Sequence, residues 1–339
     1  MSKDQVYMRR ALELARLGLG TVSPNPMVGC VIVHENQIVG EGWHQIYGGP
    51  HAEVNAIANV TDKEILLACT VYVNLEPCAH FGKTPPCADL LVAHQVKRVV
   101  VANVDPNPLV GGKGIKKLEA AGIEVVIGVL EHEGQELNKR FFRGLASQRP
   151  YVILKWAETS DGFIARANYD SKWISSPGSR MLVHKWRAEE DAIMVGANTA
   201  LYDDPQLTVR DWSGRDPLRI VIDRNLRLPD HLKLFTDTLP TLRYNLHKSE
   251  KFETYELVRV DAEQFIDNLL HDLYTRGIRS VIVEGGSAVL HYLIDNKLWD
   301  EARVFVSRQH FGEGIRAPKV SGLFAEEYIE DDKLLIFKN

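Results

Sequence analysis

One histidine and two cysteines constrain the fold of this 339-residue chain more than any other feature. His51 opens the tripeptide His51-Ala52-Glu53, and Cys78 and Cys87 bound the segment PCAHFGKTPPC. One imidazole and two thiolates occupy three of the four tetrahedral positions of zinc and leave the fourth for water, which is typical of a catalytic site. Glu53 is near enough to reach that water and poorly placed to be a fourth ligand. The fold must therefore bring two distant segments together around one ion.

The order of these residues predicts a particular chemistry. H-x-E followed by P-C-x-x-C is the signature of zinc deaminases, in which the glutamate is the general acid and base. Here Cys87 lies nine residues after Cys78 instead of three. A positioned proton shuttle such as Glu53 accelerates such a reaction by about 10²–10⁴-fold. Taken singly, His51 could be a capping or core histidine and each cysteine a buried free thiol, but the combination favours metal-assisted deamination.

Composition and charge argue against several classes of protein. A net charge of -5 gives no electrostatic reason to expect binding to nucleic acid or to a membrane surface. No apolar run approaches the ~18 residues that span a membrane, and the N-terminus leads into an amphipathic run instead of a signal sequence. Four cysteines in so long a chain do not make a disulfide framework. We therefore expect a cytoplasmic protein with no nucleic acid and no membrane as partner.

Alternating strand and helix patterns predict a layered α/β fold for the first part of the chain. The two metal-ligand segments each open a predicted helix, where the partial positive charge of the helix N-terminus stabilises a thiolate. The predicted strands are 27–33, 37–42, 70–75, 98–102 and 124–129. The predicted helices are 4–17, 53–60, 88–94, 114–121 and 136–146.

A second α/β series follows the segment Ser147-Gln148-Arg149-Pro150, where we place a domain boundary. The length of the chain also favours two domains. The predicted strands of this series are 151–156, 192–195, 218–222, 280–283 and 302–306. The predicted helices are 177–188, 262–275 and 286–295.

Four further side chains near the metal motif are candidates for the same site. Asn25, in Pro24-Asn25-Pro26, could read the edge of a heterocyclic ring, and the alternative is an ordinary turn asparagine. His44 and His80 could line a pocket or serve as structural or solvent-facing histidines. Lys83 could meet a substrate phosphate or be a solvated loop lysine.

Three segments of the first half resemble the deaminase half of the bifunctional riboflavin-biosynthesis deaminase/reductase family. They are residues 23–29 (SPNPMVG), 49–53 (GPHAE) and 76–87 (EPCAHFGKTPPC). The wide cysteine spacing with GKTPPC is the most specific of them. It is unlike the short spacing of cytidine, guanine and transfer-RNA adenosine deaminases.

The resemblance implies a function for each residue of the motif. The zinc ligands are His51, Cys78 and Cys87, with one zinc ion per chain, and Glu53 is the proton shuttle. The implied fold is a cytidine-deaminase-like three-layer domain. The implied substrate is a diaminopyrimidinone that carries a ribosylamino 5′-phosphate and is deaminated at its C2 amine.

The second half shows no G-x-G-x-x-G fingerprint after its first strand, so a standard dinucleotide-binding fold is not expected. Its most informative segment is Val283-Glu284-Gly285-Gly286-Ser287, between an apolar strand and an amphipathic helix. Paired glycines before a helix let backbone N–H groups approach a phosphate. The alternative is a strand-to-helix turn without a ligand.

Longer patterns in the second half resemble the reductase half of the same family, which looks like dihydrofolate reductase in fold and uses NADPH. These patterns lie at residues 154–155, 160–162, 171–174, 195–199 and 203–210. The resemblance implies cofactor contacts from Ala157, Trp173, Thr199, Asp203 and Gly286. It implies substrate contacts from Ser171, Arg187, Leu207, Arg210 and Glu284.

The residue types suit these implied contacts. Arg187 and Arg210 offer the bidentate donors that a ribose phosphate accepts, and Glu284 suits a sugar hydroxyl or a ring amine. As alternatives, Arg187 could be a helix-surface charge and Trp173 a core anchor. The implied reaction is a hydride transfer that opens the ribosylamino sugar to a ribitylamino chain. The sequence offers no evident protein acid or base for this step.

We therefore predict a two-domain enzyme. A zinc-dependent pyrimidine deaminase occupies residues 1–146, with Asn25 as a further substrate contact, and an NADPH-dependent reductase occupies residues 149–339. Small phosphorylated pyrimidines are the expected partners, and a homo-oligomer is compatible with the sequence. Three alternatives stay open: a deaminase with a non-catalytic second domain, a nucleic-acid-editing or binding protein, and a structural zinc module.

Overall fold

The computed structural model describes residues 2–81, 85–107, 110–171 and 174–339, so Lys83 and Trp173 lie outside the described residues. The chain divides into two compact units, Met1–Gln148 and Arg149–Asn339. Each unit has its own sheet and its own apolar core. Among the described helices, none has the length and apolar character needed to cross a membrane.

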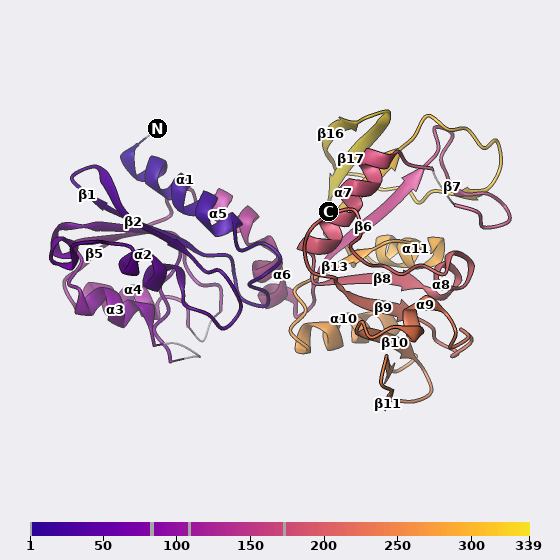
Figure 1. The fold of residues 1–339 in the computed structure, drawn as a ribbon, viewed down its shortest axis with the longest axis horizontal. Coiled ribbons are helices and arrows are strands. Elements are labelled where there is room, and N and C mark those ends of the chain that lie inside the picture. The colour runs from indigo at the N-terminus through magenta and orange to yellow at the C-terminus, as the bar shows by residue number, and fades with distance from the viewer. Residues whose placement is uncertain (1, 82–84, 108–109, 172–173) are drawn as a thin grey trace. The chain divides into compact units, whose positions relative to one another are not determined.

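A five-stranded sheet forms the centre of the first unit (Figure 1). Strand β1 pairs antiparallel with β2 and β3, whereas β3, β4 and β5 run parallel. The β1–β2 hairpin turns at Glu35 and Asn36, whose φ values of 47° and 65° are those of a two-residue hairpin loop. In spatial order the strands are β2 (Gln37–Trp43), β1 (Gly29–His34), β3 (Thr70–Leu75), β4 (Arg98–Asn103) and β5 (Glu124–Ile127).

Helices cover both faces of this sheet and make the three layers that the sequence predicts (Figure 1). Successive strand residues point to opposite faces, so Ile32 packs in the cluster of Ala56 from α2, whereas Val31 packs in the cluster of Met8 from α1. Helices α3 and α4 pack on the same face of the sheet as α2, and α5 packs on the same face as α1. The bounds are α1 (Lys3–Arg16), α2 (Ala52–Ala58), η1 (Lys63–Ala68), α3 (Cys87–Ala93), α4 (Lys113–Ala120), α5 (Glu131–Leu137) and α6 (Lys139–Ser147).

The single helix predicted at 136–146 is wrong. The structure has two helices here, and Asn138 at their junction ends α5 and begins α6 with φ −100° and ψ 23°. The apolar periodicity of the two helices is continuous enough to hide the break. At this junction the Asn138 side chain forms hydrogen bonds with a loop that lies 111 residues earlier in the chain.

The second unit is built on a ten-stranded sheet. Its neighbouring strands β12, β10, β9, β8, β13, β6 and β14 run parallel to one another. Antiparallel strands complete both edges. In spatial order they are β11 (Glu250–Lys251), β12 (Glu256–Arg259), β10 (Thr241–Asn245), β9 (Leu218–Ile222), β8 (Ala192–Gly196), β13 (Ser280–Val283), β6 (Tyr151–Glu158), β14 (Glu301–Val306), β17 (Asp332–Lys338) and β16 (Leu323–Ile329). A separate pair consists of β7 (Phe163–Ala165) and β15 (Ile315–Arg316).

Helices again pack on both faces of this sheet (Figure 1). Leu269 and Leu290 from two helices belong to the core of one face, and Trp186 and Phe235 from two others belong to the core of the opposite face. The first face carries α10 (Phe265–Thr275) and α11 (Ser287–Asp295), and the second carries α7 (Pro177–Glu189), α8 (Ala197–Asp203) and α9 (Lys233–Thr236).

Strand β10 was not predicted because Arg243 and Asn245 make its sequence resemble a polar loop. Both residues are buried. Arg243 forms a buried ion pair with Asp223 at 2.7 Å, and the Asn245 amide binds backbone groups of its own turn. An ion pair with a neighbouring segment and hydrogen bonds within the following turn therefore allow a polar pattern in a buried strand.

Candidate active sites

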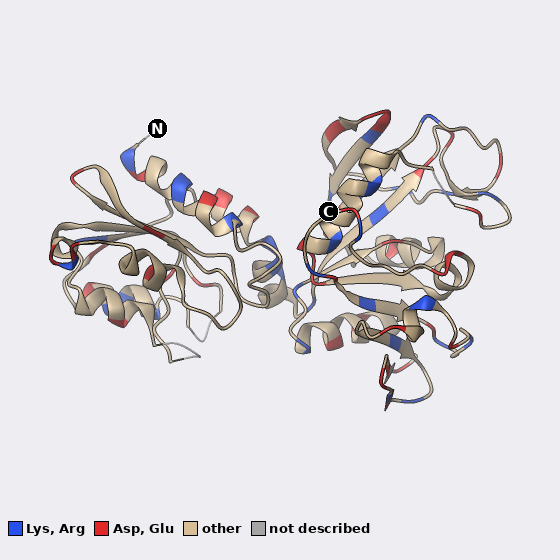
Figure 2. Cartoon of the chain, in the orientation of Figure 1, with Lys and Arg blue, Asp and Glu red and all other residues tan. Residues whose placement is uncertain are grey.

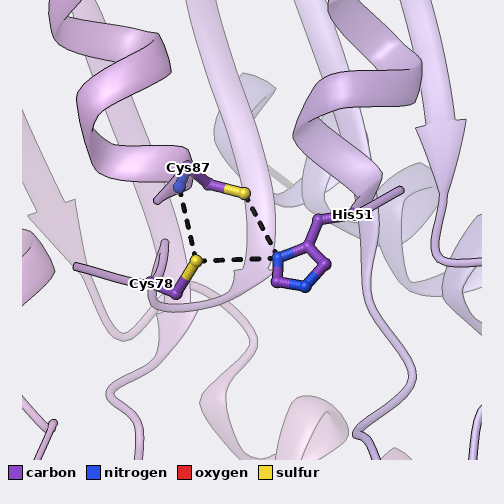
Figure 3. Close-up of side chains that lie close together, drawn as sticks. All are labelled: His51, Cys78 and Cys87. Atoms are coloured by element: carbon purple, nitrogen blue, oxygen red, sulfur yellow. Dashed lines mark hydrogen bonds between the residues drawn. The ribbon is translucent and has the colours of Figure 1, made fainter. Parts of the chain in front are cut away.

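Three ligand-type side chains meet at the N-termini of two helices in the first unit (Figure 3). His51 is the N-cap residue of α2, Cys87 is the first residue of α3, and Cys78 follows β3. Both helices begin close to the carboxyl end of β3, so the sheet brings together groups that are far apart in the sequence. The partial positive charge at each helix N-terminus favours thiolates at this position.

The distances between these side chains fit a single zinc ion. His51 Nδ1 lies 3.6 Å from Cys78 Sγ and 3.3 Å from Cys87 Sγ, and all three donor atoms lie within 4.8 Å of one another. Tetrahedral bonds of about 2.0–2.3 Å place neighbouring ligand atoms about 3.5–3.8 Å apart. One imidazole nitrogen and two sulfurs at these separations are the donor set of a catalytic zinc site.

Glu53 lies in the first turn of α2 beside this cluster and is only 3% exposed. Burial raises the pKa of its carboxyl, and the neighbouring Cys78 sulfur raises it further. The hydrogen bond with Cys87 and the approach of His51 lower the pKa of Cys78 to about 4. The site thus combines an easily ionised sulfur with a carboxyl group whose proton affinity is raised, which suits proton transfer.

Asn25 and His44 lie next to the metal cluster and are linked to it. The His44 ring stands edge-on to His51, with centroids 5.5 Å apart. His44 Nδ1 lies 3.0 Å from the Pro50 carbonyl oxygen, so Nδ1 is the protonated nitrogen and Nε2 accepts from Asn25 Nδ2 at 3.2 Å. Burial lowers the pKa of His44 and favours this neutral form. With its amide nitrogen engaged, Asn25 can present its carbonyl oxygen to a ring amine. His80, by contrast, is exposed.

A cavity of about 1230 Å³ lies in the second unit, at the carboxyl ends of parallel strands. Ala157, Gly196, Asp223 and Glu284, which end or directly follow β6, β8, β9 and β13, all line it. Ligands of open parallel sheets bind in such a crevice. The volume is ample for a nucleotide cofactor and a second small molecule.

Most of the residues that the resemblance selects in this half line the cavity. They are Ala157, Ser171, Arg187, Thr199, Asp203, Arg210, Glu284 and Gly286. Leu207 instead lies in the adjoining core, 3% exposed and with φ 57°, and is not among the lining residues. Its contact with substrate stays a prediction.

A buried charge cluster occupies one side of the cavity. Arg187 Nε and Nη2 donate to the two carboxylate oxygens of Glu284 at 2.7 and 2.8 Å. Lys155 Nζ lies 3.8 Å from Glu284 Oε2. Although burial alone would raise it, these two cations lower the pKa of Glu284 to about 2, whereas burial lowers the pKa of Lys155. Arg187 is therefore not a helix-surface charge, and Lys155, which the sequence patterns included without a role, is a cavity residue.

The paired glycines directly follow Glu284 and line the cavity together with residues of α8. Gly285 and Gly286 have φ values of 108° and 29°, and Gly286 N–H donates to Thr199 Oγ1 at 2.9 Å. This bond joins two predicted cofactor residues. Ser171 Oγ donates to Asp203 Oδ2 at 3.4 Å and joins a predicted substrate residue to a predicted cofactor residue.

Two arginines after β9 extend the cavity and were not selected from the sequence. Arg224 lies over the Phe265 ring at 5.1 Å, and Arg227 donates to the Asn198 side chain. Both stand at a strand end that contributes no glycine motif. Only their position beside α8 and the paired glycines indicates a role, so a local pattern could not have found them.

These two units define a class of protein. A three-layer α/β unit with a His-Cys-Cys zinc site and a buried glutamate is a zinc-dependent deaminase, and the parallel-sheet unit that follows is an NADPH-dependent reductase with the fold of dihydrofolate reductase. The model of the cytidine and deoxycytidylate deaminase zinc-binding region matches residues 1–103, and the model of the RibD C-terminal domain matches residues 150–325.

Relatives match nearly the whole chain. The riboflavin biosynthesis protein RibD of Aquifex aeolicus is 43% identical over 92% of this chain and 89% of its own length. RibD of Escherichia coli is 39% identical over 93% and 90%. A Thermotoga maritima crystal structure, described as a diaminohydroxyphosphoribosylaminopyrimidine deaminase/5-amino-6-(5-phosphoribosylamino)uracil reductase, has a TM-score of 0.91 at 38% identity and covers 99% of this chain and 98% of its own. The chain belongs to the RibD family of bifunctional deaminase/reductases of riboflavin biosynthesis.

Proposed function

We propose that residues 1–146 deaminate 2,5-diamino-6-(5-phosphoribosylamino)pyrimidin-4-one at C2 and that residues 149–339 reduce the ribosyl side chain of the product to ribityl. The observation that carries this proposal is the presence of two distinct sites in one chain. The first is the His51, Cys78 and Cys87 cluster beside Glu53. The second is the cavity of the parallel-sheet unit. The description of the Thermotoga maritima relative supports the choice of substrate.

In the deaminase site, His51 Nδ1 and the two cysteine sulfurs hold the zinc ion. When bound, zinc supplies the Lewis acidity that makes a water nucleophilic near neutral pH. Glu53 would accept one proton of the attacking water and pass it to the ring nitrogen, and it would then move the second proton, from the new hydroxyl group, to the amine, which leaves as ammonia. Burial raises the pKa of Glu53, so its carboxyl can both take and return a proton.

Asn25 holds the pyrimidine in place against these groups. Its amide nitrogen is 3.2 Å from His44 Nε2, and His44 is fixed by the carbonyl oxygen of Pro50, the residue before the metal ligand His51. This chain of contacts sets the position of Asn25 relative to the metal cluster. The Asn25 carbonyl oxygen then accepts a hydrogen bond from a ring amine.

In the reductase site, NADPH supplies the hydride. Ala157, Thr199, Asp203 and Gly286 contact the cofactor, together with Trp173. The bond between Gly286 and Thr199 fixes the paired-glycine turn before α11, where the helix N-terminus favours phosphate. Arg224 and Arg227 at the end of β9 supply the positive charge for the additional phosphate of NADPH.

Ser171, Arg187, Leu207, Arg210 and Glu284 contact the substrate. Reduction adds a hydride to C1 of the ribosyl group, and the ring oxygen that leaves C1 takes up a proton. Lys155 is the cation placed to donate it, because it lies 3.8 Å from Glu284 and burial lowers its pKa. Glu284, ionised by Arg187 and Lys155, accepts hydrogen bonds from substrate hydroxyls.

The setting of the enzyme follows from the same chemistry. Two metal-binding thiolates require a reducing compartment, and we assign the enzyme to the cytoplasm. Its partners are small phosphorylated pyrimidines, in line with the net charge of -5 and with Lys and Arg that are interspersed with Asp and Glu along both units (Figure 2). A homo-oligomer is the assembly we propose on the precedent that most soluble oligomers consist of identical chains.

Glu53→Gln tests the deaminase assignment. The variant keeps the size and hydrogen-bonding capacity of the side chain but cannot accept the proton. Deamination should fall by about 10²–10⁴-fold, which is the contribution of a positioned proton shuttle. Ammonia release measures it, and the zinc content and the rate of NADPH oxidation with the deaminated substrate should stay at wild-type values.

The matched control is Glu64→Gln, an exposed carboxylate in the same unit, which should change neither activity. Unchanged deamination in Glu53→Gln contradicts the proposal. So does a loss that is accompanied by loss of zinc, because the glutamate would then be a ligand.

A further inference from the structure

Asn138 makes a pair of hydrogen bonds with the loop that carries Asn25. Its Oδ1 accepts from Met27 N at 2.8 Å, and its Nδ2 donates to Met27 O at 2.9 Å. The side-chain amide thus pairs with both backbone groups of a single residue, as a neighbouring strand would. Asn138 is 3% exposed and Met27 is also buried, so both bonds are shielded from water.

The backbone of Asn138 is itself held on both sides. Its N–H donates to Gly134 O at 3.1 Å at the end of α5, and its carbonyl accepts from Phe142 N at 3.0 Å at the start of α6. These two bonds fix the Asn138 backbone, and they therefore fix the point from which its side chain extends. The preceding residue, Leu137, packs against Met27 in the same apolar cluster, which adds a second, non-polar contact between this junction and the loop.

A second asparagine completes the attachment of Met27. Asn74 on β3 donates from Nδ2 to Met27 O at 3.0 Å and accepts from Gly29 N at 2.8 Å. Asn74 serves both the loop and the start of β1, whereas Asn138 is the partner of the Met27 N–H. Loss of Asn74 would disturb the sheet, but loss of Asn138 would release the loop alone.

The loop that is held in this way leads directly to the deaminase site. Asn25, two residues before Met27, donates from its backbone N–H to Val22 O at 2.9 Å, and its side chain reaches His44. Fixing Met27 on one side and Val22 on the other leaves little freedom for Asn25. A displacement of Met27 would move the Asn25 amide relative to the metal cluster.

We propose that Asn138 is a positioning residue of the deaminase, which sets Asn25 for substrate binding through Met27. This inference rests on the substrate contact proposed for Asn25. It assigns a catalytic purpose to the α5–α6 junction, which lies outside the region matched by the deaminase zinc-binding model, residues 1–103. The deaminase site is therefore complete only when the chain reaches α6.

The primary test is the deamination kinetics of Asn138→Ala and Asn138→Asp in the full-length zinc-loaded protein. Asn138→Ala removes both bonds, and KM for the pyrimidine substrate should rise about 10- to 100-fold, within the range of a hydrogen bond lost to the substrate. Asn138→Asp keeps the acceptor for Met27 N and loses the donor to Met27 O, which retains Asn74, so its KM should lie between wild type and Asn138→Ala. The kcat values should change less than KM, as expected when a binding contact is lost.

A matched control separates positioning from stability. Asn103 is also buried, and its Nδ2 donates to Glu131 O at 3.0 Å at the start of α5. Asn103→Ala should lower the unfolding temperature without raising the deamination KM. Reductase activity in the same chain provides an internal reference, which none of these variants should alter.

A double-variant cycle decides whether Asn138 acts through Asn25. In Asn25→Ala the contact is already lost, so Asn25→Ala/Asn138→Ala should have the KM of Asn25→Ala alone. Additive increases in KM would overturn the inference. So would an unchanged KM in the folded, zinc-containing Asn138→Asp, which decides the matter if Asn138→Ala does not fold. An unchanged KM in Asn25→Ala would instead overturn the substrate contact proposed for Asn25. A raised KM in Asn25→Ala together with an unchanged KM in both Asn138 variants would overturn only the positioning role of Asn138.

Discussion

Each unit has a glutamate in its functional site, and the pKa values of the two carboxyl groups are shifted in opposite directions. Burial raises the pKa of Glu53, and the nearby Cys78 sulfur, which is negatively charged when ionised, raises this pKa further. Glu284 is buried as well, but Arg187 and Lys155 lower its pKa to about 2. The identity of the neighbours, and not the degree of burial, therefore decides whether a glutamate moves protons or remains an anion.

The two sites also differ in how their parts are assembled. The metal cluster and its glutamate come from residues 51–87, carried by α2, α3 and the end of β3. The reductase cavity is lined by residues from Lys155 to Ile315 at the ends of several parallel strands. A metal site needs a few directional donors, whereas a dinucleotide and a sugar phosphate need an extended wall. Damage to one site should therefore leave the other intact.

Removal of the metal should have the largest effect and should separate the two activities. Dialysis against a chelator, or the substitution Cys87→Ser, should abolish deamination, because the remaining donors cannot hold the ion in place. NADPH oxidation with the deaminated substrate should be unchanged. Activity assays combined with metal analysis check this, and re-addition of Zn²⁺ should restore the chelated enzyme but not the variant. A parallel fall in both activities would show that the two units depend on each other.

The depressed pKa of Glu284 predicts an acid-sensitive second unit. A carboxyl group whose pKa is lowered on folding adds stability above its unfolded pKa, and this stability is lost as the pH falls through the folded value. The stabilisation should thus be complete above pH 4.5 and disappear towards pH 2. At about 1.4 kcal/mol per pKa unit, it is on the order of 3 kcal/mol.

Urea unfolding at several pH values, followed by a probe in the second unit, measures this loss. Glu284→Gln has no charge to lose, so its stability should depend less on pH over the same interval. A Glu284→Gln profile as steep as that of wild type would place the acid sensitivity elsewhere in the unit.

Arg224→Ala should have the smallest effect, and it tests which part of the cavity binds the additional phosphate of NADPH. If Arg224 meets the additional phosphate of NADPH, KM for NADPH should rise about 10-fold, within the range of a charge-assisted hydrogen bond, while KM for NADH stays the same. Initial rates with both cofactors provide the measurement. Arg215→Ala, which removes an arginine that pairs with Asp191 and does not line the cavity, is the control. Equal increases for NADPH and NADH would remove the phosphate contact from the proposal.

The sequence predicted the first site better than the second for a physical reason. His51, Cys78 and Cys87 are rare residue types whose chemistry restricts what they can do together, and their strand-to-helix junctions were visible as local periodicity. In the second half, Arg187 and Glu284 were selected only by resemblance, and the pattern of charges did not show that they pair. Lys155 belonged to a matched pattern but was given no role, and Arg224 and Arg227 were not selected at all, because lysines and arginines are common and their function depends on what lies nearby.

The sequence by itself predicted the order of strands and helices around the metal motif, a boundary at residues 147–150, and the donor atoms offered to zinc, since each of these is encoded in short local segments. Only the tertiary structure decided that Leu207 lies in the core, that one predicted helix is interrupted at Asn138, and that Glu284 stays ionised between two cations. These outcomes depend on burial and on partners that are up to 111 residues apart. Desolvation and pairing arise when the chain packs, and local periodicity carries no record of them.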